Sequence, residues 1–408
     1  MNAVLTVILL LLSSKGTWLY GSNNAWFVIM FFFLAVGFKT KRFTYRDLHY
    51  ISYFALIYLL IMIFRYVFLN SLPFRYLLTD VVFFTKYLFV SYLYVALLKE
   101  KTTIYLAKYI ALAAAISIPF YIVQLAAPSL LQSIGAKLPF AFGDDQYVSF
   151  GVFTFVQGHF IRNTGFAWEP GAYGCFLNIG LLLNFIHNDF KIDKSVKWIM
   201  IAIFTTLSTT TYTSMLVVML IYYRANGGKF GKLLTLGGPV LVVAATQLPF
   251  LLGKIVDIYN HDMMDISMIN YLSEFYKDEG SEMPLNRFAS VVYLIQLFGI
   301  QLLWGVSNPY QDTVEILKNI NISNGIIDFC AKFGVLGLSY GLYQYGKYIY
   351  TYVKRVELSI YAVVLILMLS FGEPILILPI VLIFYFVNHY VRETVYNEDV
   401  DTENLKLV

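Results

Sequence analysis

The sequence is poor in charge, in cysteine and in histidine, and each shortage excludes a class of protein. Charged residues make up 13% of the 408 positions, about half their usual share in soluble domains. Two cysteines and five scattered histidines give neither a disulfide framework nor a metal-ligand spacing. A formal net charge of +4 is too small to indicate nucleic acid as a partner. With 59% hydrophobic and 18% aromatic residues, the composition instead predicts an integral membrane protein.

Long apolar runs recur through the chain, and a helix needs about 20 such residues to cross a bilayer. The first run, MNAVLTVILLLLSSKG, lacks a basic start and a signal-peptidase site, so we expect a retained first span. The fold class that we expect is all-α: one polytopic membrane domain, residues 1–408, with about twelve transmembrane helices. The expected spans are residues 2–14, 24–38, 50–69, 78–98, 104–126, 171–187, 196–209, 211–223, 233–252, 324–346, 358–371 and 374–390.

The basic residues predict how these spans are oriented. Eighteen of the 29 Lys and Arg lie in alternate loops, at the adjoining span ends and in the C-terminal tail. Basic loops of membrane proteins face the cytoplasm, so both termini are predicted to be cytoplasmic. The opposite face then carries two long loops, residues 127–170 and 253–323, which hold most of the unusual polar residues.

Polar residues crowd into FIRNTGFAWEPGAYG (160–174), and the Glu-Pro pair of this segment recurs at 373–374. Pro170 suits the first turn of a helix, and the helix dipole favours the carboxylate of Glu169 beside it. One interpretation is that Glu169 caps that helix and pairs with Arg162. The alternative is that Arg162 faces an anionic substrate, because a guanidinium can hold a phosphate with several donors at once.

A second arginine, Arg287, opens an apolar stretch after an acidic segment. It is either an interfacial anchor that snorkels to the lipid headgroups or a second phosphate ligand. Downstream, Asn324, Asp328 and Lys332 are spaced by four residues and are expected to share one helix face. Asp328 and Lys332 alone would also make an ordinary intrahelical ion pair.

Four ionisable residues stand out in the apolar runs or at their ends: Arg65, Asp80, Lys86 and Glu373. A charge at the centre of a bilayer costs about 2.5–3.5 kcal/mol, so such residues usually face a cavity or a partner. We expect Arg65 and Asp80, toward the outer ends of neighbouring spans, to pair with each other.

No metal ion or other cofactor is expected. Metal-dependent oligosaccharide transferases place an acidic pair in an early outward loop, and the first such loop here, SKGTWLYGSNN, has no acid. Asp144 and Asp145 form an acidic pair in a later loop, which we interpret as solvated. The six hydroxyl side chains of LSTTTYTS (207–214) suit either sugar binding or helix packing.

Together these motifs resemble those of bacterial O-antigen and capsule polysaccharide polymerases of the Wzy type, within the O-antigen ligase and polymerase superfamily. The order of the motifs over residues 160–340 carries the resemblance. They are RNTGFAWEPGAYG (162–174), the hairpin TLSTTTYT (206–213), Arg287 before an apolar run ending in GVS (305–307), and SNG (323–325) before KFGVLG (332–337).

The resemblance implies an inverting, metal-independent glycosyltransferase of the GT-C kind in the bacterial inner membrane, with its active site on the periplasmic face. Such polymerases join oligosaccharide repeat units carried on undecaprenyl diphosphate. The implied partners are the lipid-linked donor and acceptor, membrane lipid and a chain-length regulator. Arg162 and Arg287 are the implied diphosphate ligands, and Glu169 is the implied general base or a group that orients an arginine. The implied substrate-binding residues are Arg65, His159, Asn324, Lys332 and Glu373.

One position departs from the related O-antigen ligases, in which a histidine commonly precedes the Asn at the start of the tenth span. Ser323 stands there, and His159 lies in a different loop. A ligase that transfers glycan to the lipid A core is therefore the less favoured alternative, and the general base stays unassigned. A transporter is a further alternative, but the sequence lacks the paired repeats that many transporters have.

Overall fold

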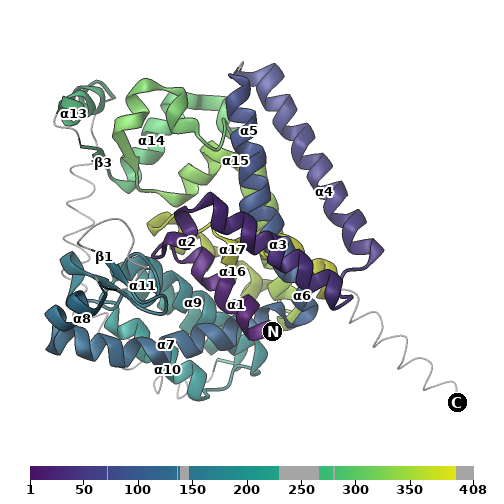
Figure 1. Ribbon diagram of the computed structural model, residues 1–408, viewed down its shortest axis with the longest axis vertical. Coiled ribbons are helices and arrows are strands. Elements are labelled where there is room, and N and C mark those ends of the chain that lie inside the picture. The colour runs from purple at the N-terminus through teal and green to yellow at the C-terminus, as the bar shows by residue number, and fades with distance from the viewer. Residues whose placement is uncertain (71, 136, 138–146, 229–265, 279–280, 392–408) are drawn as a thin grey trace, which may run out of the picture.

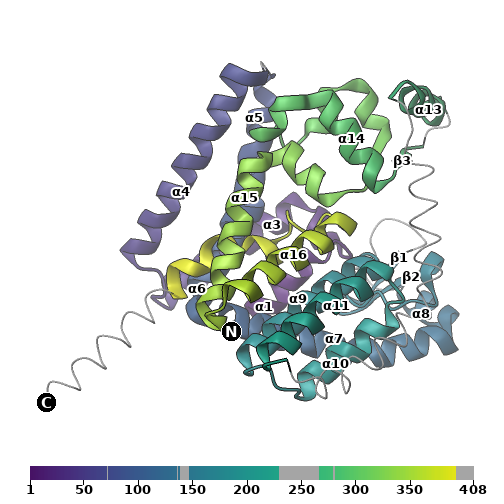
Figure 2. The same ribbon diagram turned by 180° about the vertical axis from the view of Figure 1, so that it is seen from behind.

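The computed structural model describes residues 1–70, 72–135, 137, 147–228, 266–278 and 281–391. The described chain is almost wholly helical, as expected (Figures 1 and 2). Its strands form two short pairs, β1 (Tyr147–Ser149) antiparallel to β2 (Thr154–Val156) and β3 (Met283–Leu285) parallel to β4 (Ile320–Ile322). The predicted span 233–252 and the pair Asp144 and Asp145 lie outside the described residues.

Each predicted span within the described residues coincides with helix, the last one only from Pro379 onward. Two helices continue into π-helical segments: α4 (Tyr45–Phe64) into η1 (Arg65–Asn70), and α5 (Phe74–Phe83) into η2 (Phe84–Phe89). The 3-10 segments are η3 (Lys99–Lys101), η4 (Gln157–His159), η5 (Gly299–Leu303), η6 (Tyr310–Thr313) and η7 (Glu315–Asn319). The α-helices are α1 (Asn2–Ser13), α2 (Trp18–Gly21), α3 (Asn23–Lys39), α4 (Tyr45–Phe64), α5 (Phe74–Phe83), α6 (Val90–Leu98), α7 (Thr102–Ala126), α8 (Pro128–Gly135), α9 (Pro170–His187), α10 (Lys194–Thr205), α11 (Thr209–Ala225), α13 (Ile266–Asp278), α14 (Arg287–Phe298), α15 (Gly325–Val353), α16 (Val356–Gly372) and α17 (Pro379–Leu382).

Among the described residues, three helical segments are long and apolar enough to cross a membrane: Tyr45–Val67, Phe74–Ala126 and Gly325–Val353. This is fewer than the twelve or so spans that we expected. Other apolar helices have 10–17 residues, and a helix of about 12 residues reaches only about 18 Å across a hydrocarbon layer of about 30 Å. Length alone does not assign the shorter helices, because a short apolar helix is stable both in a locally thinned bilayer and when neighbouring helices bury it.

The segment Phe74–Ala126 contains two of the predicted spans, 78–98 and 104–126. Lys99 lies between them with a φ of 53°, in the left-handed region that interrupts a helix. α6 therefore ends at Leu98, and α7 starts anew at Thr102. The predicted division into two helices is confirmed at this point.

The main core surrounds α9, in which every residue from Pro170 to Ile186 is buried. Helices α7, α10, α11 and α16 pack around it. Two glycines allow this close approach, since a Cβ at Gly174 would overlap Thr211 of α11 and one at Gly180 would overlap Ile110 of α7. The packing fixes the N-terminal end of α9, where the predicted functional segment joins it.

A second, smaller core lies between α14, the strands β3 and β4, and the first turns of α15. Helix α4 stands along one side of the molecule, apart from most of the bundle, in both views (Figures 1 and 2). Large apolar side chains on α4, among them Leu56, Leu59 and Leu60, are exposed. An exposed apolar helix face of this kind is suited to contact with lipid.

Candidate active site

The carboxyl group of Glu169 stands at the start of α9 but is not used as a helix cap. Glu169 is the N-cap residue and Pro170 lies in the first turn, yet the Glu169 side chain makes no capping hydrogen bond. Its Oε1 accepts a hydrogen bond from Nε1 of Trp168 at 3.2 Å. The ion pairs of the described residues include none between Glu169 and Arg162. Glu169 thus occupies the expected N-cap position, but within the described residues its side chain neither caps α9 nor forms an ion pair with Arg162.

Arg162 is held in place by the turn between α10 and α11. Its Nε donates a hydrogen bond to the carbonyl of Thr206 at 3.1 Å, and the N–H of Asn163 donates to the carbonyl of Thr205 at 2.9 Å. From α7, Gln124 donates to the Arg162 carbonyl at 3.0 Å. Partial burial lowers the pKa of Arg162, while the carboxylates of Glu169 and Glu373 raise it. The guanidinium is thus fixed at one nitrogen and lies in the field of both carboxyl groups.

Glu373 brings a second carboxyl group to Glu169. It follows the last residue of α16, is only 5% exposed, and its side chain forms a hydrogen bond with that of Glu169. A Cβ at Gly171 would lie 2.5 Å from Oε1 of Glu373, so Glu373 lies directly against the first turn of α9. The two Glu-Pro pairs of the sequence therefore meet in space.

Burial and the neighbouring Glu169 raise the pKa of Glu373 well above its ordinary value, against the opposing charges of Arg287 and Lys15. Besides burial, a second carboxyl group in such close contact disfavours ionisation of Glu373, because two like charges repel each other.

Arg287 is directed at this carboxyl pair from another part of the chain. It is the first residue of α14, where Asn286 caps the helix by accepting a hydrogen bond from the N–H of Ala289. Its Nη2 donates a hydrogen bond to the carbonyl of Gly372 at 3.0 Å, next to Glu373. A side chain anchored at the lipid headgroups would not bind the end of α16 in this way. The position agrees with the prediction that Arg287 and Glu169 belong to one site.

Lys15 is the site residue that the sequence prediction missed. It follows α1, with a φ of 49°, and its ammonium group lies 4.9 Å from the ring centre of Trp168 and 5.6 Å from that of Tyr20. Burial and, to a lesser extent, the positive charge of Lys332 lower its pKa from 10.5 to about 8, against the opposing charges of Asp328, Glu373 and Glu169. One signal was available in the sequence: Lys15 is a basic residue in the first loop of the face that is otherwise poor in them.

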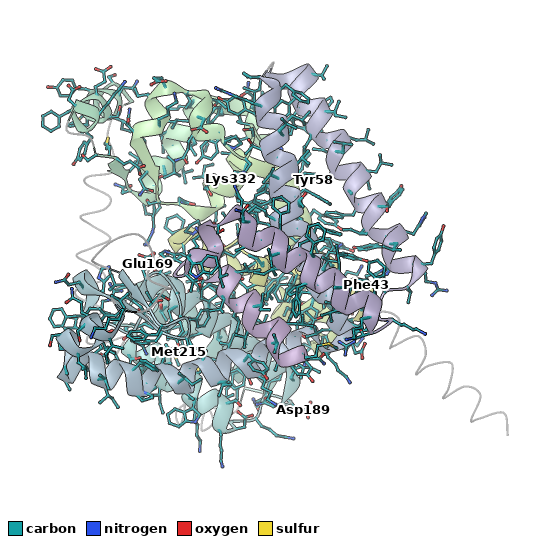
Figure 3. The ribbon with its side chains drawn as sticks, viewed as in Figure 1. Phe43, Tyr58, Glu169, Asp189, Met215 and Lys332 are labelled. Atoms are coloured by element: carbon teal, nitrogen blue, oxygen red, sulfur yellow. The ribbon has the colours of Figure 1, made fainter. Side chains whose placement is uncertain are left out.

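The three residues spaced along α15 have different roles. Asn324 precedes the helix as its N-cap, accepting hydrogen bonds from two backbone N–H groups, and its Nδ2 donates to the carbonyl of Arg287 at 3.1 Å. Asn324 therefore positions Arg287. Asp328 and Lys332 form the predicted intrahelical ion pair at 2.8 Å, and the hydroxyl of Tyr310 donates to Asp328 at 3.0 Å. Figure 3 shows Lys332 on α15 and Glu169 at the start of α9. The charges of both residues act on the pKa of Lys15.

Arg65 and Asp80 pair as predicted, with Nη2 and Oδ2 separated by 3.6 Å and both side chains buried. Asp80 also accepts hydrogen bonds from the N–H of Asn308 at 2.8 Å and from the hydroxyl of Tyr66 at 3.2 Å. Arg65 lines an apolar cavity rather than the carboxyl pair. The predicted contact of Arg65 with substrate is therefore expected in this cavity.

The two remaining candidate residues are His159 and Lys86. His159 accepts a hydrogen bond at its carbonyl from the N–H of Arg162 at 2.8 Å, so it adjoins the site through the backbone. Whether its imidazole binds substrate stays a prediction. Lys86 donates to Oδ1 of Asn23 at 2.8 Å and lies over the ring of Trp26 at 5.5 Å. These partners satisfy the ammonium group of Lys86, which does not lie at the carboxyl pair.

No family model, curated protein or solved structure matches the chain. The chemistry of the site follows from its own geometry. Three cations, Arg162, Arg287 and Lys15, act on the two carboxyl groups, while Lys332 is neutralised by Asp328. The site therefore has an excess of positive charge and a proton acceptor, an arrangement that suits an anionic ligand.

Proposed function

We propose that the protein is a polysaccharide polymerase of the bacterial inner membrane, a glycosyltransferase of the GT-C kind. Its substrates are oligosaccharide repeat units on undecaprenyl diphosphate, joined on the periplasmic face. Three apolar helices of membrane-spanning length support the location, and the shorter apolar helices complete the proposed multi-span layout with cytoplasmic termini. The observation that carries the proposal is the meeting of Arg162, Arg287 and Lys15 at the Glu169 and Glu373 pair.

In the proposed reaction, a hydroxyl oxygen of the acceptor sugar attacks the anomeric carbon of the donor glycan. The bond from that carbon to the diphosphate oxygen breaks with inversion, and undecaprenyl diphosphate leaves. Negative charge grows on the leaving diphosphate, where fixed cations are worth most, so Arg162, Arg287 and Lys15 stabilise the transition state. The acceptor proton passes to Glu169 as its carboxylate, and general-base assistance of this kind contributes about 10²–10⁴-fold.

The position at which related ligases carry a histidine is occupied by Ser323 here. Its hydroxyl donates a hydrogen bond to the carbonyl of Leu285 at 2.6 Å. A hydroxyl committed in this way is a poor base, so the proton acceptor is assigned to the carboxyl pair. This assignment favours the polymerase over the ligase.

The proposal is tested with purified protein in lipid vesicles, given a synthetic undecaprenyl diphosphate oligosaccharide. A ladder of products that differ by one repeat unit is the expected result, and Glu169→Gln should abolish it. A single transfer to added lipid A core, without a ladder, would instead identify a ligase. Movement of the unchanged lipid across the vesicle membrane would identify a transporter.

A further inference from the structure

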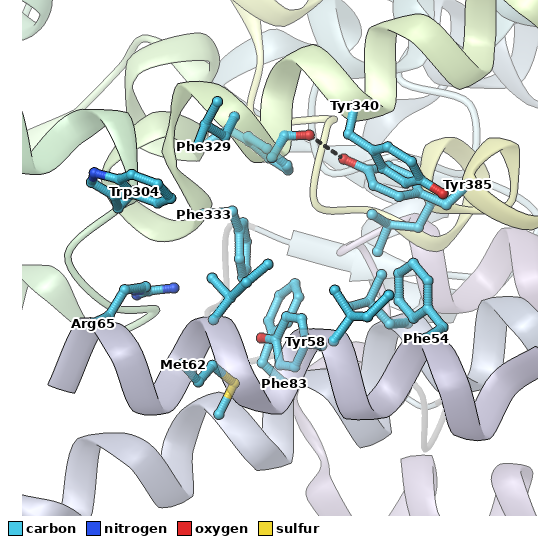
Figure 4. Close-up of a pocket in the computed structure, with 16 residues that line it drawn as sticks. Phe54, Tyr58, Met62, Arg65, Phe83, Trp304, Phe329, Phe333, Tyr340 and Tyr385 are labelled. Atoms are coloured by element: carbon cyan, nitrogen blue, oxygen red, sulfur yellow. Dashed lines mark hydrogen bonds between the residues drawn. The ribbon is translucent and has the colours of Figure 1, made fainter. Parts of the chain in front are cut away.

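An apolar cavity of about 330 Å³ lies between α4, α15 and the end of α5 (Figure 4). Its walls include Ile57 and Ile61 of α4, Phe83 of α5, and Phe333 and Leu336 of α15. Binding sites for small molecules begin at about 300 Å³, so the space can hold part of a ligand. Its lining is almost entirely hydrocarbon and aromatic, which requires an apolar occupant.

All three segments of membrane-spanning length contribute to this cavity: Tyr45–Val67 through α4, Phe74–Ala126 through Phe83, and Gly325–Val353 through Phe333. The cavity therefore lies among the helices that the proposed function places in the bilayer. The α4 wall is also the helix that stands apart from most of the bundle (Figure 1).

Among the lining residues that the structure describes, only Arg65 is charged, and its guanidinium lies at the edge of the cavity beside Trp304 in Figure 4. Arg65 is 1% exposed, and its Nε and Nη2 make no hydrogen bond within the described protein. Asp80 balances its charge from 3.6 Å but leaves these donors unused. Buried unsatisfied donors are costly, and they indicate a polar ligand group at this end of the cavity.

Aromatic rings connect the cavity to the carboxyl pair. Phe83 and Phe333, with ring centres 4.6 Å apart, are in the cavity wall. Phe83 stacks on Tyr87 at 4.7 Å, Tyr87 lies 6.1 Å from Tyr20, and Tyr20 lies under the ammonium group of Lys15. A series of neighbouring aromatic rings thus connects the cavity wall to Lys15 of the candidate active site.

We propose that this cavity binds the hydrocarbon chain of the lipid diphosphate substrate where it joins the headgroup, with Arg65 donating to an oxygen at the phosphate end. The inference rests on the proposed function, because the chain belongs to that substrate. The cavity would then determine lipid specificity: the enzyme should discriminate between substrates by the length of their hydrocarbon chain, independently of their sugars.

Filling the cavity tests the assignment. Ile61→Trp on α4 and Leu336→Trp on α15 each place an indole in the cavity, and Leu60→Trp is the matched control because Leu60 is exposed and does not line it. Wild type is compared on a long-chain lipid diphosphate and on a short-chain, water-soluble analogue. The two filling variants should lose about tenfold or more in kcat/KM on the long chain and little on the short one. Leu60→Trp should behave as wild type.

A second measurement does not depend on activity. A lipid diphosphate with a diazirine near the headgroup end of its chain should cross-link to peptides of α4 and α15 in wild type and in Leu60→Trp, but not in the filling variants. The inference is overturned if the cross-links fall elsewhere, or if the filling variants keep the preference for the long chain. It is also overturned if a photoactivatable phospholipid labels the same peptides and the lipid diphosphate does not displace it. Cross-linking at the cavity without any polymer would retain the lipid site and reject the polymerase.

Discussion

At the scale of single residues, the site consists of three cations around two carboxyl groups that lie against each other. Arg162, Glu169 and Arg287 were expected from the sequence, because each is a conspicuous polar residue at the border of an apolar run. Lys15 was not expected, although it is a basic residue in a loop of the face that is otherwise poor in them. Its importance depends on the partners that the fold brings to it.

Lys15 predicts how activity depends on pH. Its pKa is lowered to about 8, so the free enzyme loses this ammonium charge as pH rises through that value. A diphosphate then binds less well, and kcat/KM, which reports groups of the free enzyme, should fall above pH 8. Lys15→Arg stays charged and should remove this alkaline decline, while Lys15→Met should be weak at all pH values. An alkaline decline that is the same in wild type and Lys15→Arg would show that Lys15 does not bind the diphosphate.

The arginine at position 287 predicts a strict requirement for the guanidinium group. Arg287→Ala removes a cation that acts most strongly in the transition state, at an expected cost of about 10²–10³-fold in rate. Arg287→Lys keeps the charge but loses the planar fork that reaches Gly372, so its rate should also be low. The control is Arg224→Lys, at an exposed ion pair with Glu357, which should leave the rate unchanged. Full activity of a well-folded Arg287→Lys would restore the interpretation of Arg287 as an interfacial anchor.

At the scale of the elements, the apolar runs predicted where helices occur, because a helix buried against lipid and a helix buried against other helices both need apolar residues. They did not predict which helices cross the membrane, since a short run buried within a bundle looks like part of a span. The contact between the two Glu-Pro pairs could not be predicted from the sequence either. It depends on α9 and α16 packing side by side, and no local pattern specifies that contact.

The first turn of α9 gives a prediction about this contact. A Cβ at Gly171 would crowd Oε1 of Glu373, so Gly171→Ala should push the two carboxyl groups apart while disturbing little else. Displacing a catalytic group by about 1 Å can cost about a hundredfold in rate, and a loss of that order is expected with a small change in thermal stability. Gly158→Ala is the control, because its Cβ would meet nothing within 4 Å. If Gly171→Ala has normal activity, the carboxyl pair does not act as a unit.

At the scale of the whole molecule, the cations and carboxyl groups gather at one end of α9, and the basic loops were predicted on the opposite face. Figure 3 shows Glu169 at the start of α9 and Asp189 beyond its far end. The sequence predicts an orientation from the charge of the loops, and this orientation stays a prediction. It could not predict the cavity beside α4, which depends on how far that helix stands from the others.

Orientation can be measured with single cysteines at the two ends of α9. A membrane-impermeant thiol reagent should label Gln157→Cys in intact cells, since that exposed residue lies in the predicted periplasmic loop. Asp189→Cys, on the predicted cytoplasmic side, should be labelled only after lysis. The native Cys175 and Cys330 are buried, so their background should be low. Labelling of Asp189→Cys from outside would reverse the proposed topology.

The most direct test of the proposed glycosyl transfer is its stoichiometry. Purified wild-type protein is incubated with the lipid-linked oligosaccharide, and free undecaprenyl diphosphate and new glycosidic bonds are measured in the same sample over time. Because the hydroxyl attack expels the diphosphate, every new bond should release one undecaprenyl diphosphate, and Glu169→Gln should stop both together. Release of undecaprenyl diphosphate without new bonds, or no release while the substrate is bound, would contradict the assignment of this site as a polymerase centre.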